Sequence, residues 1–382
     1  MQLKPKLRFT QFKDDWKKIP LSNVCHIVGG GTPNTNELIN WNGNINWFTP
    51  SEIGKTRFVS ESQRKITKFG LYNSSAKLLP IGTILFTSRA TIGEMSILEN
   101  ESTTNQGFQS LIVNKNYDRD FVYFLQNKIK EYAFSKAIGS TFLEISKTNL
   151  SKFETYYPTL PEQTRITTML NLHYKKCQLQ KEKVELLQRQ KQAIVAKYFA
   201  NKNYGDVMIF SDILEEYTIR NTNLYKPVAV GKYGIRLRED IYSKELSTNI
   251  VNNKVITKDT LTIGMGTTQI DIGILWQDIS YSVSPAYHTF RISNNTDAYF
   301  LNEYMKYSNK LLSNLYMVTG ARQGKSINKE AFLRHSIHLP NTSEQLKKRK
   351  FWELLDKKLT LESQKFTLLQ KYKQGLLQKM FV

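Results

Sequence analysis

Two stretches of the chain carry apolar residues at the spacing of a long helix. Residues 162–200 contain no proline or glycine, and apolar or near-apolar residues recur there in steps of three and four; residues 343–380 repeat these steps. Such steps form a heptad seam, and each stretch is predicted to be one helix of about 38 residues, or about 57 Å at 1.5 Å per residue. Because a single seam needs a partner, we expect the two helices to pair with each other; the alternative is that each docks separately on its own domain. The residues predicted to pair the helices are Leu170, Val184, Leu187, Ile194, Leu355, Phe366, Leu369 and Leu376.

The two predicted helices also begin alike. Pro161 suits a first helical turn, and Glu162 favours the positive end of the helix dipole. In the second stretch Thr342 or Ser343 is expected to cap the helix, and Glu344 follows.

Each helix is preceded by a region of mixed strand and loop patterns, which we call the first and the second head. In the first head we expect a turn into a buried strand over 78–86, further strands at 95–98 and 110–113, and a helix at 121–137. The second head is expected to have a strand at 259–263 and a helix at 298–315. The prediction is an α+β fold with two heads, each followed by a long helix, the helices pairing as an antiparallel coiled coil with pseudo-two-fold symmetry. The predicted boundaries are 1–158 for the first head, 159–203 for the first helix, 204–340 for the second head and 341–382 for the second helix.

The chain repeats itself once, weakly but in order. Residues 158–163 resemble 340–345, a shift of 182 residues, and both segments contain Glu-Gln. The same shift brings 191–194 onto 373–376. The fronts of the two halves differ more, because the Gly-Gly-Gly-Thr-Pro segment of the first half has no counterpart in the second. Two copies of one plan with divergent fronts suggest two related readers of different targets.

Composition points to a polyanionic partner. The formal net charge is +21 and the pI about 9.6, which makes nucleic acid the first candidate and a merely basic surface the alternative. Cys25 and Cys177 lie far apart and have neither disulfide nor zinc spacing. No signal peptide is evident, and no apolar run reaches the roughly 18 residues of a membrane span. We therefore expect a protein of the reducing cytoplasm.

Several loops combine glycine with side chains suited to DNA. Arg, Asn, Gln, Ser and Thr read base edges, while Lys and Arg hold phosphates; the alternative for any one loop is a solvated turn. In the first head the candidate DNA-binding residues are Thr32, Asn34, Thr49, Ser51, Lys55, Ser88, Arg89, Thr91, Asn105, Gln106, Ser140 and Thr141. In the second head they are Lys232, Tyr233, Arg236, Arg238, Thr267, Thr268, Gln269, Arg322, Gln323 and Lys325.

Taken together, the chain resembles the specificity subunit of Type I restriction–modification systems over nearly its whole length. The segments that carry the resemblance are 30–33, 47–53, 89–93, 105–107, 158–163, 231–238, 282–287, 320–325 and 340–345. No single motif is diagnostic; the order of two heads and two long helices is the specific part. The resemblance implies that each head reads one half of a split double-stranded DNA site, while the helices set the gap and dock two modification subunits.

The same resemblance implies that this chain is not an enzyme and holds no metal or cofactor. S-adenosylmethionine would be bound by the modification subunits, and ATP and Mg by the restriction/translocase subunits of a bacterial or archaeal cytoplasm. The segment 320–326 resembles a phosphate-binding loop with one residue too few between its glycines. His335 and His338 have a metal-like gap but no third ligand nearby, and a surface strand explains them better. A structural adaptor and a nuclease are the alternatives, and salt-sensitive, sequence-selective DNA affinity would argue against the adaptor.

Overall fold

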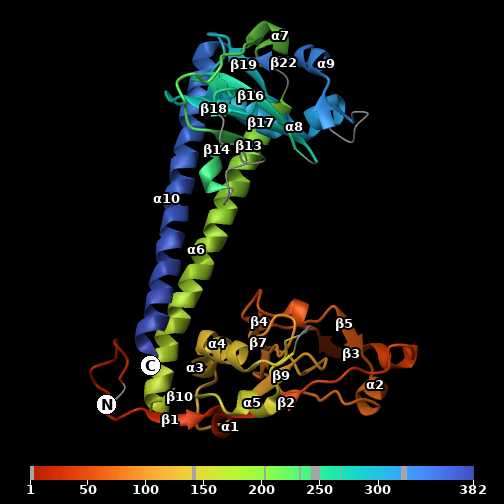
Figure 1. The fold of residues 1–382 in the computed structure, drawn as a ribbon, viewed down its shortest axis with the longest axis vertical. Helices are drawn as coiled ribbons and strands as arrows, with labels where there is room; N and C mark the ends of the chain where they lie inside the picture. The colour runs from red at the N-terminus through yellow and green to blue at the C-terminus, as the bar shows by residue number, and fades with distance from the viewer. Residues whose placement is uncertain are drawn as a thin grey trace. The chain divides into compact units, whose positions relative to one another are not determined.

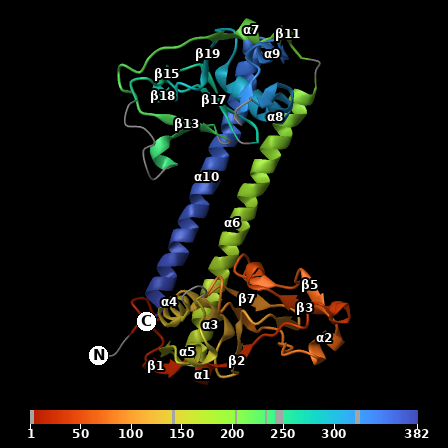
Figure 2. The ribbon, with the colours of Figure 1, turned by 45° about the vertical axis from the view of Figure 1, so that its right-hand side comes forward.

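The computed structural model describes residues 4–139, 143–201, 204–231, 234–241, 250–266, 268–319 and 325–382. The chain divides into two compact units, which Figure 1 and Figure 2 draw from two directions. Unit 1 comprises Met1–Leu179 and Phe366–Val382, and unit 2 comprises Gln180–Lys365. Each unit therefore contains one head and a part of both long helices. In the described part of the chain, no helix is long and apolar enough to cross a membrane.

The two long helices are α6 (Leu160–Ala200) and α10 (Thr342–Met380), with 41 and 39 residues. The periodicity thus predicted their length to within a few residues, and Pro161 lies in the first turn as expected. The predicted cap of α10 is wrong by one residue. Asn341 caps this helix, because its Oδ1 accepts a hydrogen bond from the backbone N–H of Glu344 at 3.0 Å, while Thr342 already belongs to the helix.

Within each unit α6 and α10 lie side by side and contact each other. In unit 1 the Nε2 atom of His173 lies 2.9 Å from the carbonyl oxygen of Leu369. In unit 2 the amide of Gln180 donates to Glu362 Oε2 at 2.6 Å, and Lys191 Nζ lies 2.6 Å from Asp356 Oδ1. Later residues of α6 meet earlier residues of α10, so the two helices run in opposite directions inside unit 2.

The head of unit 1 is built on a sheet with the strand order β2-β9-β6-β7-β4, a smaller sheet β5-β3-β8, and the ribbon β1-β10. Its strands are β1 (Lys17–Pro20), β2 (Cys25–Gly29), β3 (Trp41–Phe48), β4 (Phe58–Val59), β5 (Arg64–Ile66), β6 (Ile84–Phe86), β7 (Met95–Leu98), β8 (Ser102–Thr104), β9 (Gln109–Val113) and β10 (Glu154–Tyr157). Its helices are α1 (Leu21–Val24), α2 (Lys68–Tyr72), α3 (Arg119–Phe124), α4 (Gln126–Lys136) and α5 (Lys147–Ser151), with 3-10 turns η1 (Leu38–Asn40) and η2 (Pro50–Glu52).

One local prediction for the first head needs correction. The helix predicted at 121–137 is divided into α3 and α4, because the backbone N–H of Leu125 bonds to Val122 only three residues earlier and tightens the turn. The turn into a strand expected over 78–86 is present, since a turn with Gly82 at φ 85° precedes β6. The strands expected at 95–98 and 110–113 are present as β7 and β9.

The head of unit 2 is built on a sheet with the order β12-β19-β16-β17, joined by the ribbons β11-β22, β13-β14, β15-β18 and β20-β21. Its strands are β11 (Asp206–Ile209), β12 (Leu214–Glu216), β13 (Val228–Gly231), β14 (Gly234–Leu237), β15 (Lys254–Ile256), β16 (Thr260–Met265), β17 (Ile270–Leu275), β18 (Tyr281–Val283), β19 (His288–Ile292), β20 (Met317–Thr319), β21 (Lys325–Ile327) and β22 (Ser336–Leu339). Its helices are α7 (Phe210–Ile213), α8 (Ala298–Tyr316) and α9 (Lys329–Leu333), with the 3-10 turn η3 (Arg238–Asp240). The strand and helix predicted for this head correspond to β16 and α8.

The two heads share one plan. In each, a ribbon and a short helix lead into the edge strand of the main sheet, and a head helix packs its apolar face into the core. Phe121 of α3 and Phe300 of α8 are both fully buried there. A second short helix then leads back to the ribbon and into the long helix. The repeat detected in the sequence is therefore a duplicated fold.

Candidate nucleic-acid interface

Four loops of unit 1 meet at one place, and we call residues 30–32, 49–51, 88–91 and 105–107 the unit 1 loop cluster. Backbone hydrogen bonds link the loops: Gly31 N donates to Thr104 O at 2.9 Å, and Asn105 N donates to Phe48 O at 3.0 Å. The guanidinium of Arg89 donates to the carbonyl oxygen of Gln106 at 2.8 Å. The structure thus brings together candidate residues that lie far apart in the sequence.

Glycine is required where these loops touch. A Cβ added to Gly30 would lie 1.9 Å from the carbonyl oxygen of Asn105, and one added to Gly107 would lie 2.8 Å from Pro50 Cγ. Only a residue without a side chain fits such an approach. The glycines expected to allow close backbone approach therefore serve contacts between loops.

Several polar side chains of the cluster reach its surface. Thr32 Oγ1 donates a hydrogen bond to Gln106 Oε1, and the hydroxyl of Thr49 donates to Glu52 Oε2 at 2.6 Å. The Arg89 side chain is 37% exposed and pairs with Glu144 at 3.6 Å. An exposed ion pair of this kind contributes at most about 1 kcal/mol, so a phosphate or a guanine edge could replace Glu144 as the partner of Arg89.

A pair of tryptophans packs together beside the loop of residues 30–32. The rings of Trp41 and Trp47 meet edge to face at 5.0 Å, and Trp47 Nε1 donates to Gly31 O at 2.8 Å. The guanidinium of Arg64 lies over the Trp41 ring, 3.7 Å from its centroid. Arg64 was not among the predicted residues, because the stacking depends on β3 and β5 being neighbours, which no local pattern indicates.

The remaining candidates of the first head have different surroundings. Ser88 is fully buried, so its hydroxyl cannot reach DNA in this conformation; its backbone is hydrogen-bonded between Gly107 and Ile145, at 2.8 and 3.0 Å. The exposed Asn34 side chain donates to Glu37 at 2.9 Å. Lys55 and Thr91 are exposed. Ser140 and Thr141 lie outside the described residues.

In unit 2 the described candidates lie in several elements. Thr268 and Gln269 lie in the turn between β16 and β17, and Arg236 lies in β14, whose Ile235 packs on Gly273 of β17. Arg238 follows β14, and Lys325 begins β21. The predicted residues that lie outside the described part of the chain are Lys232, Tyr233, Thr267, Arg322 and Gln323.

The residues predicted to pair the helices have unequal burial. Leu170 and Leu376 belong to the core of unit 1, while the others, apart from Ile194, are half-buried. Ile194 is 39% exposed, and Val195 and Phe199 are buried in its place. A straight helix drifts by about 20° per heptad against a 3.5-residue repeat, so the buried face has moved by nearly one residue at this end of α6.

A second apolar row on each long helix is exposed and was missed. In unit 1 it contains Leu172, Leu179 and Leu368, which are 67%, 56% and 66% exposed; in unit 2 it contains Leu186, Leu354 and Leu361, which are 54%, 63% and 66% exposed. The leucines of each helix are seven residues apart, and the shift of 182 relates the two sets. This spacing was visible in the sequence as a second heptad position.

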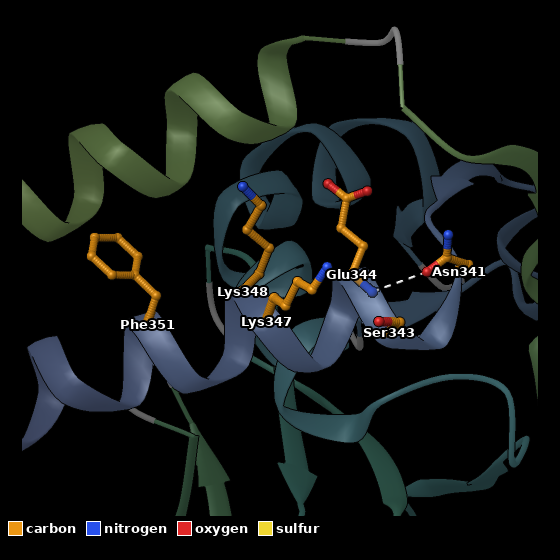
Figure 3. A pocket seen from close by; sticks show the side chains of 6 residues that line it. All are labelled: Asn341, Ser343, Glu344, Lys347, Lys348 and Phe351. Atoms are coloured by element: carbon orange, nitrogen blue, oxygen red, sulfur yellow. Dashed lines mark hydrogen bonds between the residues drawn. The ribbon is translucent and has the colours of Figure 1, made fainter.

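A cavity of about 490 Å³ lies at the beginning of α10 (Figure 3). Its lining residues are Asn341, Ser343, Glu344, Lys347, Lys348 and Phe351. The Glu344 carboxylate accepts one hydrogen bond, from the hydroxyl of Tyr198 at 3.4 Å, and burial together with this carboxylate raises the pKa of Tyr198.

Histidines and carboxylates of the described residues form no cluster of three that could hold a metal. The ring of His335 is instead held by two hydroxyls, from Tyr304 at 3.1 Å and Tyr316 at 2.8 Å. His338 lies in β22, the strand expected there. The phosphate-loop-like segment 320–326 falls mostly outside the described residues.

Known proteins resemble both the sequence and the fold. Residues 13–189 and 196–371 each match the family described as Type I restriction modification DNA specificity domain. The Type I restriction enzyme MjaIX specificity subunit of Methanocaldococcus jannaschii is 28% identical over 258 residues, which cover 64% of this chain and 58% of that protein. The chain thus spans little more than half the length of this curated relative.

Two solved structures have the same fold. The S subunit of a Type I restriction-modification system from M. genitalium has a TM-score of 0.58 at 15% identity, covering 100% of this chain and 99% of that one. A chain from a study of complex assembly and conformational transition of the type I R-M system has a TM-score of 0.62 at 14% identity, with coverage of 97% and 98%. The family matches fall on the two halves that the repeat defines, as the resemblance implied. The chain belongs to the family described as Type I restriction modification DNA specificity domain.

Proposed function

We propose that each head of this specificity subunit reads one half of a bipartite double-stranded DNA site. The observation that carries the proposal is the duplicated fold with unlike outer loops. The order β2-β9-β6-β7 of unit 1 matches β12-β19-β16-β17 of unit 2, whereas unit 1 adds β4 and a smaller sheet where unit 2 has the ribbons β13-β14 and β15-β18. One plan with two different polar surfaces suits two readers of different sequences. The charge of +21 suits the phosphate backbone that both would contact.

In unit 1 the reading surface would be the loop cluster. Arg89, Gln106 and Asn105 offer donors and acceptors for base edges, and Arg64 on its tryptophan lies in a smaller sheet next to the cluster. In unit 2 the surface would include Arg236, Thr268 and Gln269, together with the predicted Arg322.

We further propose that α6 and α10 form an antiparallel coiled coil with pseudo-two-fold symmetry, which sets the gap between the half-sites. The opposed contacts of Gln180 with Glu362 and of Lys191 with Asp356 support this, as does the common heptad spacing. The exposed leucine rows are suited to the helices of two modification subunits, one for each copy of the row, because leucines seven residues apart form the seam of a helix pair.

Under this proposal the chemistry belongs to partner subunits in a bacterial or archaeal cytoplasm. The modification subunits would bind S-adenosylmethionine and transfer the methyl group, and restriction/translocase subunits would bind ATP and Mg. This chain would supply the recognition of the DNA sequence and the spacing between the half-sites.

The test is genome-wide mapping of methylated adenines in cells that express this chain with its cognate modification subunit. Two short half-sites around a fixed unspecific gap are expected. A continuous motif, or methylation that does not depend on this chain, would reject the proposal.

A variant with four residues inserted after Val184 and four after Lys358 tests the helices as a spacer. Four helical residues add about 6 Å, close to two base pairs, so the gap should change while both half-sites keep their bases. Changed bases at an unchanged gap would argue against the spacer.

A further inference from the structure

A buried glutamine ties the head of unit 1 to the start of its long helix. The side chain of Gln163 is 1% exposed. Its Nε2 donates to the carbonyl oxygen of Pro158 at 2.9 Å, and its Oε1 accepts from the backbone N–H of Asp118 at 2.9 Å. Asp118 is the residue before α3, so one amide joins the head helix, the incoming strand and the long helix.

Unit 2 contains the same arrangement 182 residues later. Gln345 is fully buried; its Nε2 donates to Pro340 O at 2.7 Å and to Asn295 O at 3.1 Å. Its Oε1 accepts from the backbone N–H of Asp297 at 2.7 Å, and Asp297 precedes α8. The pairs Gln163–Asp118 and Gln345–Asp297, which we call the two clasps, are therefore equivalent.

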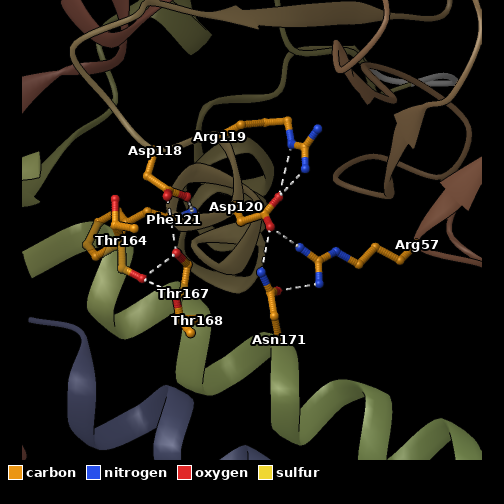
Figure 4. A network of polar contacts seen from close by, with 9 residues as sticks. All are labelled: Arg57, Asp118, Arg119, Asp120, Phe121, Thr164, Thr167, Thr168 and Asn171. Atoms are coloured by element: carbon orange, nitrogen blue, oxygen red, sulfur yellow. Dashed lines mark hydrogen bonds and ion pairs between the residues drawn. The ribbon is translucent and has the colours of Figure 1, made fainter. Parts of the chain in front are cut away.

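Each aspartate is held again one helical turn further on. In unit 1 Asp118 Oδ1 caps α3 by accepting from Phe121 N at 3.0 Å, and its Oδ2 accepts from Thr167 Oγ1 at 3.1 Å (Figure 4). Thr167 lies four residues after Gln163, on the same face of α6.

The second aspartate has an ionic partner at the matching place. Asp297 Oδ1 accepts from Phe300 N at 2.8 Å, and its Oδ2 lies 2.8 Å from Arg349 Nη1. Arg349 lies four residues after Gln345. Both clasps thus consist of a buried amide and a neighbouring side chain that act on the first turn of the head helix.

Unit 1 reinforces its clasp with a third polar contact along the same face of α6. Asp120 pairs with Arg57 at 2.9 Å and accepts from Asn171 Nδ2 at 2.7 Å (Figure 4). Burial would raise the pKa of Asp120, but Arg57 and the hydrogen bond from Asn171 lower it below its ordinary value. The head of unit 1 is therefore attached to successive turns of α6 by directional polar contacts.

We propose that Gln163 and Gln345 are positioning residues that hold each head in one orientation on its long helix and thereby limit the complex to a single gap between half-sites. This inference rests on the proposed function. Apolar packing alone permits small sliding movements, whereas an amide bonded at both ends fixes direction. A movement of about 3.4 Å at the DNA would bring a head to the next base pair.

The test uses the full complex with the variants Gln163→Met and Gln345→Met. Methionine keeps the length of the side chain and removes the two hydrogen bonds of Gln163 or the three of Gln345. We compare methylation at sites whose gap is one base pair longer or shorter with methylation at sites of the native gap. This ratio should rise about tenfold, since the loss of a buried hydrogen bond is comparable to a tenfold change in an equilibrium constant. The bases of both half-sites should stay the same.

Gln178→Met is the matched control, because Gln178 is an exposed glutamine on the same helix. It should leave the gap distribution unchanged. If Gln163→Met abolishes methylation altogether, Thr167→Val gives the decisive result: it removes one hydrogen bond from Asp118 at nearly constant volume and should broaden the gap by a smaller factor.

Hydrogen exchange provides the second measurement on the purified chain. Gln163→Met should speed exchange at the first turn of α3 and leave the first turn of α8 unchanged. If the native chain gives a split motif and the clasp variants keep its single gap, the inference is overturned. It is also overturned if the clasp variants change the bases of the half-sites. A native chain without a split motif would instead reject the proposed function, and the two failures are distinguishable.

Discussion

Unit 1 and unit 2 are alike where the head joins the long helices and unlike where loops face outward. The joining part repeats element by element: ribbon, short helix, main sheet, head helix and clasp. The outer part does not, since the loop cluster stands on Trp41 and Trp47 in unit 1, while unit 2 presents two ribbons around Val228 and Val283. The difference teaches that the attachment and the proposed reading surface are separate parts of the fold.

A second difference lies at the equivalent glutamates that begin the long helices. The Glu162 carboxylate is 1% exposed and forms two hydrogen bonds with Arg8, at 2.7 and 2.8 Å, and one with Trp16 at 3.3 Å. Its counterpart Glu344 lines an open cavity and accepts a hydrogen bond from the Tyr198 hydroxyl at 3.4 Å. One motif position is thus a buried ion pair in one unit and a cavity wall in the other.

The largest effect is expected from breaking this ion pair. Arg8→Ala leaves a buried carboxylate without its cation and should destabilise unit 1 by about 3–5 kcal/mol. Glu344→Gln at the equivalent place should cost less than about 1 kcal/mol, the usual range for a charge at a helix start. Denaturant unfolding followed by tryptophan fluorescence, with hydrogen exchange to assign the unit, measures both. Equal losses would contradict the contrast between the two glutamates.

The next effect concerns the reading surfaces. Arg89→Ala should weaken recognition by about 1–3 kcal/mol and relax one position of one half-site, and Arg322→Ala should do the same for the other half-site. Methylation mapping reads both changes. Lys115→Ala, an exposed cation outside the loop cluster, is the control and should leave both half-sites unchanged. A single variant that relaxes both half-sites would show that the heads are not independent readers.

The smallest expected effect is a difference between the two units in how stability depends on pH. Burial lowers the pKa of His335 below its ordinary 6.5, while Phe153 occupies the equivalent place in unit 1. The unfolded chain binds the proton more readily, so unit 2 should lose stability as the pH falls from 6.5 towards the lower folded pKa. His335→Phe should reduce the loss between pH 7 and pH 5 in thermal unfolding. An unchanged pH dependence would assign it to other groups.

Periodicity was enough to predict the long helices, the main strands and the duplication, because burial of one face leaves a regular trace in the sequence. It was not enough for Ile194, where a drift of a fraction of a turn decides which residue is buried. The burial of Ser88 and the stacking of Arg64 depend on which strands become neighbours. The cap formed by Asn341 depends on the exact start of a helix. The Glu-Gln repeat was visible, yet its role was not, because a glutamine that binds main-chain atoms has no distinctive neighbour in the sequence.

The partners of the two clasp glutamines are all main-chain groups: the N–H groups of Asp118 and Asp297 and the carbonyl oxygens of Pro158, Pro340 and Asn295. Every amino acid supplies a carbonyl, and all but proline supply the N–H. The contacts of the two glutamines therefore tolerate mutation of the residues that supply them, as long as a helix begins at the same point. A foreign head joined to α6 or α10 would further need an aspartate before its helix and an apolar face for the shared core, which is a short list of conditions for exchange of a whole head.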